Sequence, residues 1–181
     1  GLEDVALLKK LEFLVLGGTE VSDQSLRSLQ SIEGLQLLFF SAGENVTDSG
    51  IETLKGFKNL RVLGLANRQN MTGRFLETVG NLPGLKIVIL ACPGPIDDGL
   101  AHLKNLKNLQ ILFIAGMEIS DTGLMHLAEI KTLRHVYLGQ CVIRHAAIKR
   151  LQAALPDCEI CAKEITNQVP DAEPARNEPP T

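Results

Sequence analysis

An apolar pattern recurs through this chain with a period of 24 or 25 residues. In each copy, an apolar residue is followed by two others, three and five positions later. The copies start at Leu11, Leu35, Leu60, Leu85, Leu109 and Leu133. A regular repeat of this length is typical of units that bury their apolar side chains only against their neighbours in a stack. The period therefore predicts a solenoid of short stacked units.

The second half of each unit is typical of a helix start. Segments 22–26, 47–51 and 120–124 read Ser-Asp-Gln-Ser-Leu, Thr-Asp-Ser-Gly-Ile and Ser-Asp-Thr-Gly-Leu. Ser and Thr cap helices because their hydroxyl oxygens accept a bond from a backbone N–H of the first turn. Apolar pairs three residues apart, such as Leu26 with Leu29 and Ile51 with Leu54, then continue a helical face. Each unit is predicted to form a short strand, a turn and a short helix.

These repeats resemble the leucine-rich-repeat family, and the resemblance covers about residues 1–160. The Ser/Thr-Asp-x-Gly-Leu-x-x-Leu half is similar to variants, common in bacterial repeat proteins, that carry helices on the outer side. The resemblance implies an α/β fold: a right-handed, horseshoe-shaped solenoid with parallel strands on the concave face and short helices on the convex face. It also implies a role in binding proteins.

Two features depart from the family pattern. The unit that starts at Leu60 carries Met71-Thr72-Gly73-Arg74-Phe75 where the Asp and the helical Gly are expected, so its helix is the least supported. The position eight residues after each first apolar residue, where the family usually places Asn, is occupied by other residues. It holds Thr19, Gly43, Arg68, Pro93, Met117 and Cys141. The regular turn bonding of an Asn ladder is therefore not expected.

The ends of the repeat array set the predicted domain organisation. Residues 1–8 match the helical half of a later unit, so the chain is expected to start within a repeat of a longer protein. Leu155, Cys158 and Ile160 repeat the strand pattern 22 residues after Leu133, and charged residues alternate with them. We therefore predict a repeat domain over residues 1–161, capped by a half-repeat at 155–160. The segment 162–181 is rich in Pro and charge, which predicts a disordered tail.

The concave face of the predicted sheet is unusually apolar. Side chains alternate across a strand, so those two and four positions after each first apolar residue point away from the core. Apart from Gly64, these positions make up the candidate binding face. They are Phe13, Val15, Leu37, Phe39, Val62, Ile87, Ile89, Ile111, Phe113, His135 and Tyr137. Six strands about 4.8 Å apart give this face roughly 400–600 Å², which matches or exceeds the largest exposed patch of a typical monomer.

We predict that the chain is a non-catalytic protein-interaction module that binds its partner through this concave face. Parallel strands that are apolar on both faces are normally covered. Besides a separate protein, the cover could be a second copy of the chain, another part of the same protein, or a lipid or other apolar small molecule.

Charge and hydropathy exclude other classes of partner. The net charge is −3 and the basic residues are interspersed with acidic ones, so the sequence has no basic footprint for nucleic acid. The strongly apolar run over residues 85–96 is interrupted by Lys86 and two prolines, and it is shorter than the roughly 20 residues of a membrane span. The sequence does not indicate a cellular compartment.

Candidate chemical groups do not add up to a catalytic or metal site. Cys158 and Cys161 have the spacing of half a zinc or redox site, but Cys158 occupies a core position and no second pair lies nearby. A buried structural thiol is favoured, and a disulfide between Cys141 and Cys161 is the alternative. His102 and His126 occupy equivalent helix positions without a matching carboxylate or thiol, which favours surface histidines. We therefore predict no catalytic residues, no metal and no cofactor.

Overall fold

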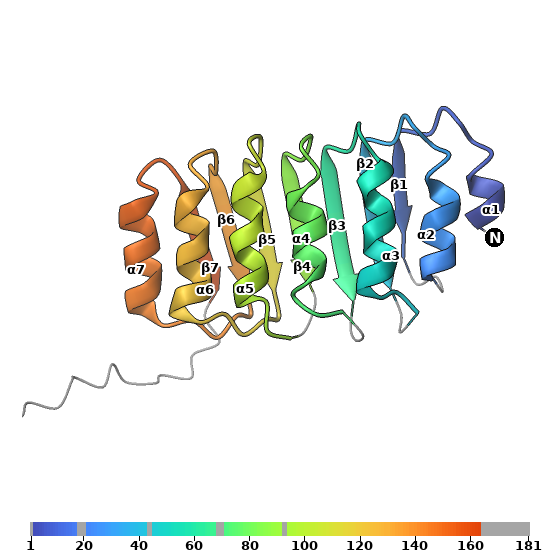
Figure 1. Ribbon diagram of the computed structural model, residues 1–181. Coiled ribbons are helices and arrows are strands. Elements are labelled where there is room, and N and C mark those ends of the chain that lie inside the picture. Colours follow the sequence, from blue (N-terminus) through green and yellow to red (C-terminus); the bar gives the residue numbers. More distant parts are fainter. Residues whose placement is uncertain (1, 18–20, 43–44, 68–70, 92–93, 164–181) are drawn as a thin grey trace, which may run out of the picture.

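A computed structural model describes residues 2–17, 21–42, 45–67, 71–91 and 94–163. Within these residues, seven parallel strands form one open sheet in sequence order (Figure 1). The strands are β1 (Phe13–Leu16), β2 (Leu37–Ala42), β3 (Val62–Asn67), β4 (Ile87–Ala91), β5 (Ile111–Ala115), β6 (His135–Gly139) and β7 (Glu159–Lys163). Each strand pairs with its neighbours in sequence, as a solenoid requires. The predicted stack of strand–helix units is confirmed.

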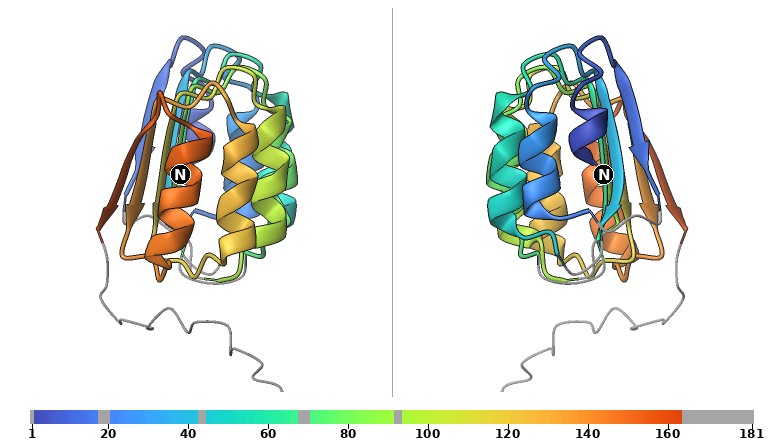
Figure 2. Two further views of the ribbon diagram at one scale, coloured as in Figure 1. Left: turned by 90° about the vertical axis from the view of Figure 1, so that its left-hand side faces the viewer. Right: turned by 90° about the vertical axis from the view of Figure 1, so that its right-hand side faces the viewer.

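Short helices connect the strands and form a second layer on one side of the sheet (Figure 1). The α-helices are α1 (Leu2–Val5), α2 (Asp23–Leu29), α3 (Asp48–Glu52), α4 (Phe75–Gly80), α5 (Asp97–Leu100), α6 (Asp121–His126) and α7 (His145–Ala154). Three of them continue as 3₁₀ turns, η1 (Thr53–Gly56), η2 (Ala101–Asn105) and η3 (Leu127–Glu129). Figure 2 looks along the stack from its two ends. The end strands β1 and β7 project beyond the strands between them, so the uncovered face of the sheet is shallowly concave.

The core lies between the sheet and the helices. In the central strands, the apolar residue three positions after each repeat start is fully buried, as in Leu38, Leu63 and Leu112. The helix pairs predicted from the sequence are buried too: Leu26 and Leu29 have no exposed surface. Because the helices are short, they gain stability mainly from this packing rather than from their own propensity.

Helix starts are capped as the sequence predicts. The hydroxyl oxygens of Ser22, Thr47 and Ser120 accept backbone N–H bonds from the first turn of α2, α3 and α6. Helix α5 has Ile96 at the corresponding position and no side-chain cap.

The Asp at the start of α2, α3 and α5 bonds to the next repeat, a contact that the sequence pattern does not predict. The carboxylate of Asp23 accepts the backbone N–H of Thr47 at 2.9 Å and its hydroxyl at 2.8 Å. Asp48 accepts the same two groups of Thr72 at 3.1 and 2.7 Å. Asp97 accepts the backbone N–H of Ser120 at 3.1 Å. These bonds tie the start of α2 to that of α3, the start of α3 to that of α4, and the start of α5 to that of α6.

The helical glycine of the repeat makes room for this Asp. A Cβ atom added to Gly50 would overlap the carboxylate of Asp23, and one added to Gly123 would overlap that of Asp97. The glycine therefore serves close packing between repeats, although it lowers the helix propensity of its own unit.

The atypical unit that starts at Leu60 is accommodated by a matched pair of changes. Its helix, which had the least support from the sequence, forms as α4. Gly73 replaces the Asp of this unit, and the next unit has Ile96 in place of the hydroxyl that such an Asp would bond. The backbone carbonyl of Gly73 instead lies where a Cβ atom on Gly99 would be. Gly73 lacks the carboxylate acceptor and Ile96 lacks the hydroxyl donor, so both groups are missing from the same contact between repeats.

The predicted register of the last strand is wrong. β7 pairs with β6 so that Ile160 lies beside Val136 and Ala162 beside Leu138, a shift of 24 residues rather than 22. Ala162 and Lys163, which we expected to belong to the tail, are therefore strand residues. Leu155 and Cys158 belong to the buried core, but they lie in the turn before β7 and not in the strand. The rest of the predicted tail lies outside the described residues.

Of the positions where the family usually places Asn, only Met117 and Cys141 fall within the described residues, and both are buried. The thiol of Cys141 lies 3.6 Å from the carbonyl oxygen of Ile114 and 3.4 Å from that of Gly139. Apolar packing with weak thiol bonds thus replaces an amide ladder here. Thr19, Gly43, Arg68 and Pro93 lie outside the described residues.

The contact between Asp23 and Gly50 can be tested by a double-mutant cycle. Gly50→Ala should lower the free energy of unfolding by about 1–3 kcal/mol, because the added methyl group overlaps the Asp23 carboxylate. In an Asp23→Ala background, the same change should cost at least about 1 kcal/mol less, since the overlapping group is gone. Urea unfolding of the four proteins measures this coupling. Additive effects would contradict the contact.

Candidate binding face

The predicted face residues all lie on strands of the seven-stranded sheet, where they alternate with core residues, so they lie on the side away from the helices. No described helix covers that side of the sheet (Figure 2). Strand pairing aligns them in two rows across the array. Phe13, Leu37, Val62, Ile87, Ile111 and His135 form the first row. Val15, Phe39, Gly64, Ile89, Phe113 and Tyr137 form the second row. The sheet therefore brings together the residues that the repeat pattern singled out, and we call these two rows the open face.

Exposure varies along the open face. Phe13 and Val15 in β1 are 63% and 65% exposed, and Phe113 in β5 is 40% exposed. The other apolar residues of the two rows are half-buried, because each lies between side chains of the neighbouring strands. Large apolar side chains that stay in contact with water at these levels are typical of an interaction surface when they are contiguous.

Gly64 interrupts the second row for a packing reason. The ring of Phe39 lies over Gly64 of the neighbouring strand, in the space that a Cβ atom at this position would occupy. The glycine is itself buried beneath the ring. The Phe39 ring thus extends the apolar surface of β2 over the neighbouring strand β3.

A second aromatic group lies further along the same row. The rings of Phe113 and Tyr137 stack with centroids 4.2 Å apart and an angle of 14° between their planes. Their strands are adjacent, so register places the two rings side by side. Such pairs are held in place by each other, so they present apolar area with little loss of conformational freedom on binding.

The C-terminal end of the open face is polar. Strand β7 adds Glu159 beside His135 and Cys161 beside Tyr137. Nδ1 of His135 lies 3.1 Å from Oε2 of Glu159, and the thiol of Cys161 lies 3.6 Å from Oε1 of the same carboxylate. The register predicted for β7 is two residues out of place, so the sequence pattern did not indicate this cluster. A 24-residue period carried through to residue 159 would have identified it.

Comparison with known proteins gives the fold but no sequence family. No protein-family model matches the chain. No curated protein matches it either. An internalin from Listeria monocytogenes has a similar structure, with a TM-score of 0.60 and 19% identity over 91% of this chain. A leucine-rich-repeat protein from Leptospira interrogans gives 0.63 and 19% over 87%. Internalin C2 of Listeria monocytogenes gives 0.60 and 17% over 90%.

The chain has the leucine-rich-repeat fold. It spans 51%, 38% and 68% of the lengths of these three proteins, so it corresponds to a part of the first two. None of the helices in the described part of this leucine-rich-repeat chain has the length and apolar character of a membrane span.

The three cysteines among the described residues of the leucine-rich-repeat domain have raised pKa values. Cys141, Cys158 and Cys161 are free, so the alternative of a disulfide between Cys141 and Cys161 is wrong. Burial raises the pKa of all three thiols, and the Glu159 carboxylate raises that of Cys161 further. A raised pKa reduces the thiolate, which is the reactive form, so the cluster around Glu159 opposes nucleophilic chemistry.

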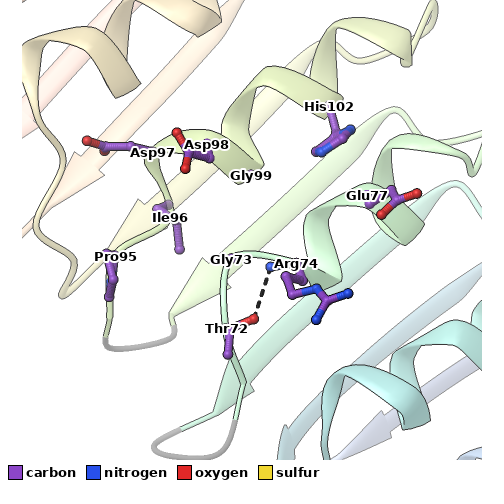
Figure 3. Close-up of a pocket in the computed structure, with 10 residues that line it drawn as sticks. All are labelled: Thr72, Gly73, Arg74, Glu77, Pro95, Ile96, Asp97, Asp98, Gly99 and His102. Atoms are coloured by element: carbon purple, nitrogen blue, oxygen red, sulfur yellow. Dashed lines mark hydrogen bonds between the residues drawn. The ribbon is translucent and has the colours of Figure 1, made fainter.

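The other candidate groups lie on the helix side. His102 and His126 are half-buried there, and within the described residues no three His, Cys, Asp or Glu side chains are placed to hold a metal ion. A hollow of about 460 Å³ lies between the starts of α4 and α5 (Figure 3). Arg74, Glu77 and Asp98 line it, and their charged ends point in different directions rather than toward a common point.

The contact between Cys161 and Glu159 can be tested through the reactivity of the thiol. Glu159→Gln removes the negative charge that holds the proton on the Cys161 thiol. The pKa of Cys161 should therefore fall, and its alkylation at pH 8 should become about two- to fivefold faster. Mass spectrometry of the iodoacetamide-treated protein, with Cys161 distinguished from the buried Cys158 by fragment ions, measures the rate.

Asp157→Asn is the matched control. It removes the same charge as Glu159→Gln, but Asp157 lies in the turn before β7. It should change the rate much less. An equal rate in wild-type protein and Glu159→Gln would show that the two side chains are not in contact.

Proposed function

We propose that this leucine-rich-repeat domain is a non-catalytic protein-interaction module whose partner docks on the open face. The observation that carries the proposal is the apolar character of a sheet face that no element of the described chain covers. All the described helices lie on the other side of the sheet, where they bury the core.

The size of the open face fits a protein partner. Two rows across six strands cover roughly 400–600 Å², over half of the ~800 Å² that one partner buries in a standard interface. At ~25 cal/mol per Å², covering ~500 Å² contributes about 12 kcal/mol before the losses of association and ordering. The stacked rings of Phe113 and Tyr137 are the natural centre of such an interface, because aromatic anchors dominate binding energy.

The shape of the open face favours a protein over a small molecule. A small apolar ligand is normally enclosed on most of its surface. The open face is only shallowly concave, and the hollow between α4 and α5 lies on the helix side among charged residues (Figures 2 and 3). A helix or an extended segment of a partner can instead lie across several strands at once.

The chemistry of the open face favours binding over catalysis. Its polar groups lie at one end, where the Cys161 thiol is held protonated beside Glu159. Elsewhere its described side chains are hydrocarbon or aromatic, and these supply contact area rather than acid, base or nucleophile.

A charge placed at the aromatic centre tests the proposal. Phe113→Asp should leave the far-ultraviolet circular dichroism and the unfolding midpoint close to those of wild type, because the ring is already 40% exposed. It should weaken partner capture at least about tenfold, since an unpaired carboxylate would be buried in the complex. Val142→Asp is the matched control: Val142 is 47% exposed and lies off the open face.

The same pair of variants identifies the occupant. Proteins captured by wild type and by Val142→Asp, but not by Phe113→Asp, are partners of the open face. A wild-type dimer that only Phe113→Asp converts to a monomer would make the occupant a second copy of the chain. Capture and mass that are equal in all three proteins would contradict a role for the open face.

A further inference from the structure

The turns that lead from helix to strand carry an excess of basic residues. Four consecutive turns, over residues 57–61, 82–86, 106–110 and 130–134, contain no Asp or Glu. Their basic residues are Lys58, Arg61, Lys86, Lys107, Lys131 and Arg134. All are exposed except Arg61, which is half-buried. In sequence they are interspersed with acidic residues, but the parallel strands gather them at one edge of the sheet, the upper edge in Figure 1. We call these six residues the basic edge.

Some members of the basic edge also have a structural role. The ammonium group of Lys107 donates to the carbonyl oxygen of Lys104 at 3.2 Å, and that of Lys131 donates to the carbonyl oxygen of Ala154 at 3.1 Å. Cations near helix C-termini are stabilised by such carbonyl groups. Lys58 and Lys86 make no side-chain hydrogen bond or ion pair with another described residue. Hydrogen bonds within the fold therefore do not explain why all six positions of the basic edge are basic.

Acidic residues lie in the turns on either side of these four, with Glu12 and Glu33 before them and Asp157 and Glu159 after them. Another group lies at the opposite edge, where the helices begin. Asp23, Asp48 and Asp97 are there, with their carboxylates bonded to the next repeat. Asp121 pairs with Arg144 at 3.0 Å and with Arg150 at 2.8 Å. These carboxylates are largely committed to contacts within the fold, whereas the cations at the basic edge face solvent. A chain with a net charge of −3 thus presents a positive strip.

The basic edge borders the open face directly. Arg61, Lys86 and Arg134 immediately precede Val62, Ile87 and His135, the first-row residues of β3, β4 and β6. With strands about 4.8 Å apart, the edge extends about 15 Å from β3 to β6. This length is within about two Debye lengths at physiological salt, so the fields of the six cations overlap.

We infer that the open face accepts a protein segment whose apolar stripe is flanked on one side by Asp or Glu residues. The inference rests on the proposed function and specifies its partner. Apolar side chains of the segment would cover the two rows, and its carboxylates would lie along the basic edge. Nucleic acid fits less well, because it would leave the adjacent aliphatic and aromatic rows in contact with water.

Selection from a random library tests the partner chemistry without knowledge of the natural ligand. Phage-displayed 16-residue peptides are selected on wild-type protein after depletion on Phe113→Asp, so that the survivors depend on the open face. The enriched peptides should combine apolar residues with an excess of Asp or Glu at one flank. One synthetic peptide from the enriched set is then the probe.

The affinity of that peptide is measured for Lys58→Glu/Lys86→Glu and for the helix-side control Arg27→Glu/Lys149→Glu, which has the same net charge. The edge variant should bind about tenfold more weakly at 0.05 M salt and within about twofold of wild type at 0.5 M salt, because salt screens exposed charges. The control should stay within about twofold at both concentrations.

The two possible failures are distinguishable. If no peptide survives depletion on Phe113→Asp, the proposed function fails, and the inference fails with it. If peptides survive without an acidic flank and bind the edge variant as well as wild type, the open face binds but the inference is overturned. Binding of a single-stranded oligonucleotide that the edge variant loses and Phe113→Asp keeps would also overturn it.

Discussion

Contact between neighbouring repeats is the interaction on which the rest of this structure depends. No unit can bury its leucines alone, since its strand and helix are each only a few residues long. On the core side, Leu38, Leu63 and Leu112 are sealed by the units before and after them. At the helix starts, Asp23 reaches Thr47 and leaves room only for a glycine at position 50. Local structure and tertiary packing are therefore the same set of contacts.

The same stacking explains why one face of the sheet is left for binding. All described helices pack on one side, so apolar residues on the other side gain no cover from within the described chain. Register then converts a repeat in sequence into two continuous rows, and it gathers dispersed lysines and arginines into one border. The open face combines fixed aromatic groups, such as the Phe113–Tyr137 stack, with a charged margin that can orient a partner.

The strands and the residues of the open face could be predicted from the sequence, because both follow from the period of the apolar pattern. The starts of the apolar pattern give the strands, and alternation assigns Phe39 and Phe113 to the open face. Features that depend on contacts between repeats could not be read in this way. The bond from Asp23 to the following repeat needs the stacking distance, and the ring of Phe39 over Gly64 needs the register. The misplaced register of β7 followed from matching Leu155 and Cys158 to strand positions, whereas both are buried in the turn.

We propose that a partner covers the open face. Hydroxyl-radical footprinting of the protein with and without a bound partner measures this most directly, because it reports solvent access to individual side chains. We predict that oxidation of Phe113, Tyr137 and Phe13 falls severalfold in the complex, while Met125 and His126 on the helix side are unchanged. Protection of Met125 and His126, with Phe113 and Tyr137 as reactive as in the free protein, would contradict the account.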